Sequence, residues 1–99
     1  MNRYLLGYDL GSSSVKASLL EVESGRLAGS VTAPQQEMEI ASPRHGWAEQ
    51  DPEAWWTNLV LATRQLLSEF QIEASAIQAI GISYQMHGLV LVDKNQQVL

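Results

Sequence analysis

Residues 9–16 read Asp9-Leu10-Gly11-Ser12-Ser13-Ser14-Val15-Lys16, so an acid and a run of small polar residues separate two apolar stretches. The flanking runs, residues 4–10 and 15–22, have the length and composition of β-strands. Gly and Ser are common turn residues because they tolerate tight backbone geometry and can hydrogen-bond locally. The stretch therefore predicts a β-hairpin whose turn is rich in hydroxyl groups.

This turn has the residue types that a phosphate-binding site needs. Gly11 lets backbone N–H groups approach a ligand, the serine hydroxyls can donate to phosphate oxygens, and Lys16 supplies positive charge. Asp9 is a natural partner for Mg²⁺, through water, since Mg²⁺ keeps much of its hydration shell. The alternative is a serine-rich hairpin with a chance acid. The stretch is neither a Walker P-loop nor a dinucleotide Gly-x-Gly-x-x-Gly motif, because it leads into a strand and not a helix.

Further along the chain, residues 27–32 form a third apolar run after turn residues at 23–26. The first three runs therefore predict a three-stranded antiparallel meander. Residues 33–50 are polar and are interrupted by Pro34 and Pro43, which indicates a long loop.

Asp51-Pro52-Glu53 has the features of a helix start, with a capping acid, Pro at the first helical position and an acid near the positive end of the dipole. The following apolar residues recur at three- and four-residue intervals and predict one broad apolar face through about Phe70. They are Trp55, Trp56, Leu59, Val60, Leu66, Leu67 and Phe70.

Residues 77–83 are almost continuously apolar, which predicts a central strand covered on both sides and, after a helical crossover, paired in parallel. Residues 89–93 are a candidate fifth strand, and turn-like residues 94–97 follow. Only Val98 and Leu99 remain for a returning strand, so we expect the chain to be truncated.

The composition indicates one small globular domain, since 45% of the 99 residues are hydrophobic and 17% are charged. The net charge is −5 and the six cations are scattered singly, which argues against nucleic acid or an anionic membrane as partner. The chain has no cysteine and no run of about 20 apolar residues. We therefore expect a cytoplasmic protein.

Gln85, Met86, His87 and Gly88 follow the strand at residues 77–83, where open α/β sheets place ligands. Gln and His can hydrogen-bond sugar hydroxyls, and Met can contact a sugar's carbon face. The alternative is an ordinary loop histidine beside a methionine that fills the core.

Trp47 could stack on a sugar or pack the loop against the helix, whereas Trp55 and Trp56 are expected to pack. The spacing of His45 and His87 matches no zinc motif, and no catalytic triad is visible.

At this point the sequence resembles a known family, the FGGY carbohydrate kinases, which belong to the actin-like, ribonuclease-H-like ATPases. Their first phosphate motif is an Asp-x-Gly-Thr/Ser-Thr/Ser-x-x-Lys/Arg hairpin, as in residues 9–16. Residues 46–56 look like the family's loop-to-helix segment, and residues 84–88 look like its sugar-contact segment. The resemblance covers the whole chain and implies an α/β fold with a ribonuclease-H-like mixed sheet. Residues 1–99 would form part of the N-terminal lobe, within the family's N-terminal domain.

The resemblance implies ATP-dependent phosphorylation of a sugar hydroxyl with Mg²⁺. Asp9 would position the metal, and Gln85, Met86 and His87 would contact the sugar. The Gln-Met-His-Gly segment is most similar to that of members acting on the ketopentose D-xylulose, which gives D-xylulose 5-phosphate. The phosphates would be held by Gly11, Ser12, Ser13, Ser14 and Lys16.

The family's catalytic Asp base, its second phosphate motif and its adenosine motif are expected beyond Leu99, so residues 1–99 alone should show no turnover. Three alternatives stay open: a family member acting on another sugar, polyol or sugar acid; another actin-like ATPase; and a non-catalytic sugar-binding or interaction module. The parent protein could be a homodimer, although the sequence does not give its oligomeric state.

Overall fold

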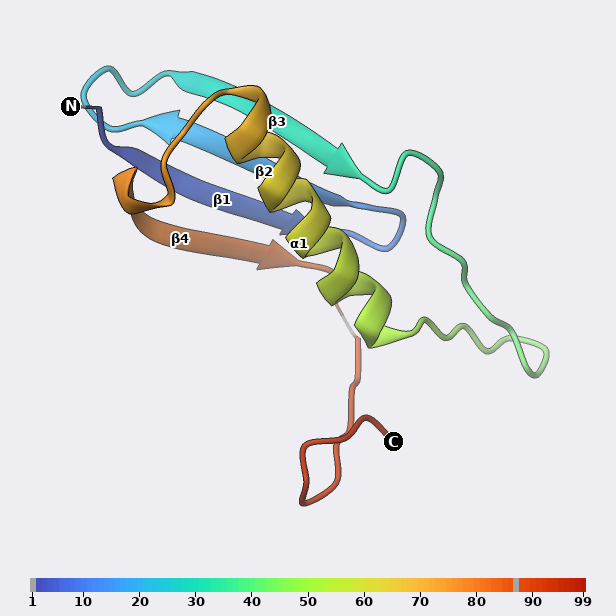
Figure 1. Ribbon diagram of the computed structural model, residues 1–99. Helices are drawn as coiled ribbons and strands as arrows, with labels where there is room; N and C mark the ends of the chain where they lie inside the picture. The colour runs from blue at the N-terminus through green and yellow to red at the C-terminus, as the bar shows by residue number, and fades with distance from the viewer. Residues whose placement is uncertain (1, 87) are drawn as a thin grey trace.

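The chain folds into a four-stranded mixed sheet with one long helix (Figure 1). The computed structural model describes residues 2–86 and 88–99. Between β3 and β4 the chain forms α1 (Pro52–Glu69) and a short 3-10 helix, η1 (Ala74–Ala76). The strands, in the spatial order β3-β2-β1-β4, are β1 (Tyr4–Leu10), β2 (Val15–Glu21), β3 (Leu27–Ala33) and β4 (Ile77–Tyr84).

The strand pairing confirms the predicted topology. β1 pairs antiparallel with β2, and β2 pairs antiparallel with β3, which makes the meander. After the helix the chain returns to the other side of β1, and β4 pairs with it in parallel. The carboxyl ends of β1 and β4 therefore lie side by side. The hairpin turn that follows β1 lies at the same end of the sheet.

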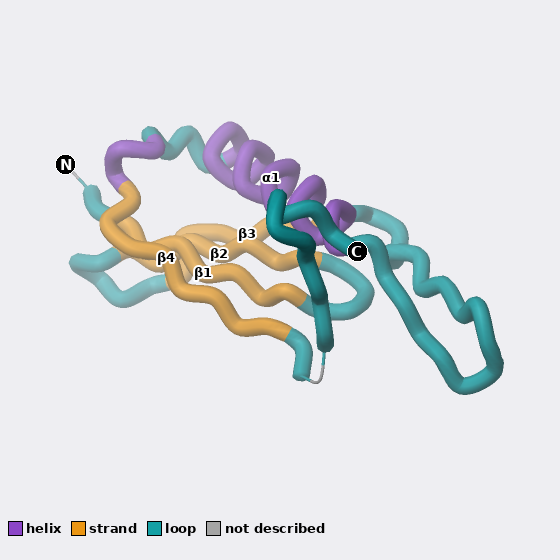
Figure 2. Tube along the Cα trace, turned by 90° about the horizontal axis from the view of Figure 1, so that it is seen from below, coloured by secondary structure: helices purple, strands orange, loops and turns teal. Residues whose placement is uncertain are grey.

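The helix covers one face of the sheet, mainly over β2 and β3 (Figure 2). Alternate residues of β1 and β2 point toward it, as the two-residue period of a strand requires. The core between the helix and the sheet is built from Tyr4, Leu6, Tyr8, Val15, Ala17, Leu19, Ala33, Ala62 and Leu66, with Ala76 of η1 beside them.

α1 begins as predicted. The Asp51 side chain accepts the backbone N–H of Glu53 at 3.0 Å, and Pro52 is the first helical residue.

The expectation that Trp56 packs is wrong, because its side chain is 63% exposed. α1 lies over β2 and β3 and leaves most of β4 uncovered. The side of the helix that carries Trp56 therefore faces an open apolar groove, which Ile80 and Ile82 of β4 also line.

The prediction of a covered central strand at residues 77–83 is wrong in its placement. β4 is an edge strand, and Ile80 and Ile82 are 59% and 58% exposed. A continuous apolar pattern indicates that both faces of a strand are suited to burial, but it does not say whether another element covers them. Ile77 at the start of β4 packs against the core, whereas residues 78–84 of the strand are all exposed.

The predicted fifth strand at residues 89–93 is also wrong. This segment extends away from the sheet (Figure 1), and in the described part of the chain it pairs with none of the four strands. It forms only an isolated bridge between Val92 and Val98 around a turn, in which Asp93 Oδ1 accepts the N–H groups of Asn95 and Gln97.

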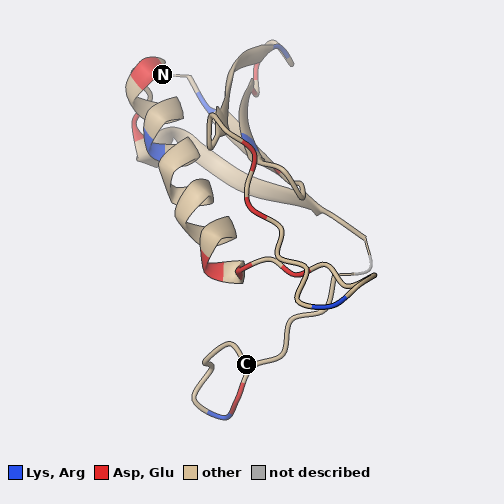
Figure 3. Ribbon diagram, turned by 90° about the vertical axis from the view of Figure 1, so that its right-hand side faces the viewer, with Lys and Arg blue, Asp and Glu red and all other residues tan. Residues whose placement is uncertain are grey.

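Charged residues lie mostly in loops and at the ends of elements (Figure 3). The Arg3 guanidinium donates to Glu23 at 2.8 Å, and this hydrogen bond lowers the pKa of the Glu23 carboxyl below its ordinary value of 4.5. Among the helices that the structure describes, none has the length and apolar character needed to cross a membrane.

Candidate functional site

The hairpin that joins β1 and β2 forms a compact turn, residues 11–14, called the serine turn below. It closes through a hydrogen bond from the Gly11 N–H to the Ser14 carbonyl at 3.0 Å. A Cβ atom on Gly11 would lie 3.3 Å from the same carbonyl oxygen, which is a tight contact. The glycine therefore lets the turn close, while Ser12 and Ser13 stay exposed to a ligand.

The long loop at residues 34–50 holds the serine turn from outside. The Met38 N–H donates to the Ser13 carbonyl at 2.8 Å. The Gln50 side-chain amide donates from Nε2 to the Ser12 carbonyl, and Gln50 Oε1 accepts the Trp55 indole N–H at 3.1 Å. These bonds connect the turn to the loop and to the first turns of α1.

The register of the sheet brings four polar residues into one line, called the polar row below. Lys16 pairs with Asp9 across β1 and β2, and Asp9 pairs with Ser83 across β1 and β4. Thr32 of β3 continues the row beyond Lys16. Directly paired residues share one face of a sheet. The row lies on the face away from α1, since Tyr8, the neighbour of Asp9, points toward the core.

The register thus pairs Asp9 with Lys16, and both are exposed. Ser83 is an addition that the sequence reasoning missed. Its Oγ is 3.5 Å from Asp9 Oδ1, close enough to influence the orientation of the carboxylate. The available signal was a hydroxyl residue at the end of an apolar strand, but its alignment with Asp9 required the parallel register.

A pocket of about 480 Å³ lies between the serine turn, the start of α1 and the segment that follows β4. Ser12, Gln50 and Gln85 are among the residues that line it. Gln85 is held there because its N–H donates to the Leu10 carbonyl at 3.1 Å, which extends the pairing of β1 and β4 by one residue. The structure therefore joins one predicted phosphate residue and one predicted sugar residue at a single pocket.

Of the other predicted sugar contacts, Met86 and Trp47 do not line this pocket. Met86 is 80% exposed and does not line it, so it is not a core residue either. His87 lies outside the described residues. Trp47 is exposed in the long loop, where the Arg44 guanidinium stacks 5.0 Å from its ring centroid.

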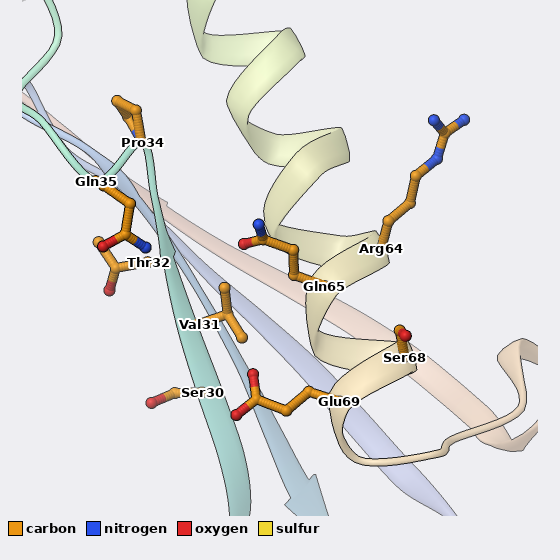
Figure 4. A pocket seen from close by; sticks show the side chains of 9 residues that line it. All are labelled: Ser30, Val31, Thr32, Pro34, Gln35, Arg64, Gln65, Ser68 and Glu69. Atoms are coloured by element: carbon orange, nitrogen blue, oxygen red, sulfur yellow. The ribbon is translucent and has the colours of Figure 1, made fainter.

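A larger groove of about 820 Å³ lies elsewhere, between α1 and the edge strand β3. Gln65 and Glu69 project from the helix toward β3, whereas Arg64 points away (Figure 4). The groove contains none of the predicted site residues. Thr32, at the end of the polar row, lies at its edge, but Asp9, Lys16 and Ser83 do not line it.

The arrangement supplies groups that hold ligands. Exposed hydroxyls, a lysine and a carboxylate lie at one end of the sheet, next to a pocket that contains two amide side chains. Hydroxyl, amide and ammonium groups are donors for phosphate oxygens and sugar hydroxyls. The described part of the chain presents no nucleophile paired with a base at this pocket.

Comparison with known proteins places these features in a family. The model described as the N-terminal domain of the FGGY family of carbohydrate kinases matches residues 4–99. The chain is 38% identical over 94 residues to a xylulose kinase of Escherichia coli K12, covering 95% of this chain and 18% of the relative. It is 40% identical over 99 residues to an L-xylulose/3-keto-L-gulonate kinase of the same organism, covering 100% of this chain and 19% of the relative.

A solved structure shares the fold. The crystal structure of a xyloylose kinase from Brucella ovis superposes with a TM-score of 0.86 and 38% sequence identity, over 97% of this chain and 19% of that one. The chain thus spans about a fifth of the length of the relatives it matches.

Proposed function

Because this chain belongs to the FGGY family of carbohydrate kinases, we propose that it forms the N-terminal part of an enzyme that transfers a phosphoryl group from ATP to a sugar hydroxyl. One juxtaposition in this chain supports the proposal above all: Ser12 of the serine turn lines the same pocket as Gln85, and Asp9 and Lys16 pair in the strands that flank this turn. Phosphate-binding groups and sugar-binding groups are therefore neighbours, as a transfer between the two ligands requires.

In this proposal the serine turn and Lys16 bind the phosphates of ATP. The exposed Ser12 and Ser13 hydroxyls donate to phosphate oxygens, and the Lys16 ammonium offsets their charge. Gly11 keeps the turn closed so that these groups stay together. The contribution of these residues to catalysis is alignment and neutralisation of charge.

Asp9 suits Mg²⁺ in its chemistry and its position. Its carboxylate is exposed, and among the described residues no cluster of three His, Cys, Asp or Glu side chains surrounds it. Mg²⁺ bound to ATP takes one or two carboxylates together with water and phosphate oxygens, and it would supply neutralisation of phosphate charge. Asp9 would hold it, with the Ser83 hydroxyl beside the carboxylate.

The sugar lies against the segment that follows β4. Gln85 lines the pocket and donates or accepts hydrogen bonds through its amide, while Met86 and His87 are its sequence neighbours. We propose D-xylulose as the acceptor, with D-xylulose 5-phosphate as the product. The support is the Gln-Met-His-Gly segment and the relative named as a xylulose kinase, whereas the other relative is named for L-xylulose and 3-keto-L-gulonate.

The test is a kinase assay of the full-length protein with ATP, Mg²⁺ and a panel that contains D-xylulose, another polyol and a sugar acid. We expect turnover to be highest with D-xylulose. Asp9→Asn should lower kcat on the order of 100-fold because it removes the carboxylate at the metal. Glu23→Gln removes an acid far from the serine turn and should leave kcat unchanged.

The outcomes separate the alternatives. Turnover with a sugar acid but not with D-xylulose would replace the substrate and keep the kinase. Sugar binding by calorimetry without phosphorylation of any acceptor would favour a binding module. Turnover by residues 1–99 alone would contradict the expectation that the catalytic base lies outside this stretch.

A further inference from the structure

Three of the four carbonyl groups of the serine turn, those of Ser12, Ser13 and Ser14, have protein donors. Gln50 Nε2 donates to the Ser12 carbonyl, the Met38 N–H donates to the Ser13 carbonyl, and the Gly11 N–H donates to the Ser14 carbonyl. Carbonyl oxygens repel an anion. Each of these hydrogen bonds therefore keeps one carbonyl oxygen of the turn directed toward the protein and away from the place where a phosphate would bind.

A fixed carbonyl also fixes the next N–H. The peptide group is planar and trans, so the Ser12 carbonyl and the Ser13 N–H point in opposite directions. Within the described ranges, no acceptor takes the N–H of Ser13 or of Ser14. The donor that Gln50 places on the Ser12 carbonyl thus orients the Ser13 N–H for an outside acceptor, as in the backbone nests that bind phosphate.

The Gln50 amide has only one workable orientation. The Trp55 indole N–H is a donor only, so it must meet Oε1, and the Ser12 carbonyl is an acceptor only, so it must meet Nε2. Of the three donors, Gln50 is the one that uses a side chain. Its contribution can therefore be removed without changing the backbone.

We propose that Gln50 is a positioning residue for ATP: it sets the serine turn in the conformation that binds phosphate, and Trp55 holds Gln50 in place. This inference rests on the proposed function. It assigns Gln50 no contact with the reacting atoms, and it predicts an effect confined to the phosphate part of the nucleotide.

The test compares ATP with adenosine, since adenosine has the base and ribose but no phosphate. Calorimetry on the full-length protein with Mg²⁺ should show that Gln50→Met weakens ATP binding about tenfold and leaves adenosine binding unchanged. Gln50→Glu should weaken ATP binding at least as much, because a carboxylate accepts from Trp55 but cannot donate to the Ser12 carbonyl.

Two further variants test whether Trp55 acts through Gln50 and whether the effect is specific to this position. Trp55→Phe keeps a ring and loses the donor, so it should weaken ATP binding by less than Gln50→Met does. The double variant, Gln50→Met with Trp55→Phe, should bind ATP as weakly as Gln50→Met alone, because both substitutions break the same chain of hydrogen bonds. Gln65→Met makes the same change on an exposed residue in the groove of Figure 4 and should leave ATP binding as in the wild type.

Equal loss of ATP and adenosine binding in Gln50→Met, or no loss of either, would overturn the proposal. A wild-type protein that binds ATP but phosphorylates no sugar would sink the proposed function, while the ratio of ATP to adenosine affinity still decides the role of Gln50. A wild-type protein that binds no ATP would overturn both.

Discussion

Gly29 of β3 lies directly against the aromatic ring of Phe70, which follows α1. A Cβ atom at Gly29 would overlap this ring, and the ring packs against the core. Gly29→Ala should therefore destabilise the protein by about 1–3 kcal/mol, the usual cost of overpacking. Chemical denaturation measures the free energy of unfolding.

Gly7→Ala is the matched control, because Gly7 is also in a strand and a Cβ there meets no atom within 4 Å. This variant should be neutral or more stable by up to about 1 kcal/mol, since Gly costs backbone entropy. If both alanine variants lose the same stability, the Phe70 contact is not what requires glycine at position 29.

Single residues also show what the sequence could not predict. The phosphate and metal roles predicted for Asp9, Lys16 and the serine turn rest on residue type and spacing. The contacts of Gln50 and Ser83 could not be predicted in this way, because the partner of each is far away in the chain. Gln50 reaches Ser12 across 38 positions, and Ser83 reaches Asp9 across 74.

At the level of elements, the start of α1 depends on one side chain. Asp51 accepts the Glu53 N–H, one of the donors that have no partner within the helix. Asp51→Ala should lower the free energy of unfolding by about 0.5–2 kcal/mol. Asp51→Asn keeps an acceptor and should lose only a few tenths. Thermal or urea unfolding distinguishes them, and equal losses would show that the cap's charge, not its hydrogen bond, stabilises the helix.

The elements themselves were largely predictable. The meander, the helix start at Pro52 and the parallel return to β1 all follow from local pattern and turn residues. The position of β4 at the sheet edge and the absence of a strand at residues 89–93 do not. An apolar run shows that a segment suits burial, but the partner that buries it is a property of the rest of the polypeptide.

At the scale of the whole molecule, the core is one-sided. α1 buries one face of β1 and β2, whereas apolar residues on the other face, among them Leu5 and Leu27, remain exposed, as do Ile80 and Ile82 of β4. Residues 1–99 therefore take their stability from the helix side of the sheet.

Two alanine substitutions, one in β2 and one in β4, test whether the stability comes from the helix side of the sheet. Leu19→Ala in β2 should cost residues 1–99 about 2–5 kcal/mol, because the side chain is fully buried. Ile80→Ala in β4 should cost less than about 1 kcal/mol, since much of its surface already meets water. Urea unfolding at several protein concentrations is the measurement. A large cost at Ile80 that grows with concentration would mean that a second copy covers β4.

The polar row has a further consequence for how the chain tolerates change in length. Each strand contributes one residue to the row, and a slip of one residue in any strand moves its member to the opposite face of the sheet. An insertion inside β1 between Tyr4 and Asp9 would turn the carboxylate toward the helix while leaving every side chain of the site in the sequence. Insertions and deletions should therefore be confined to the loops, where they leave the alternation of the strands intact.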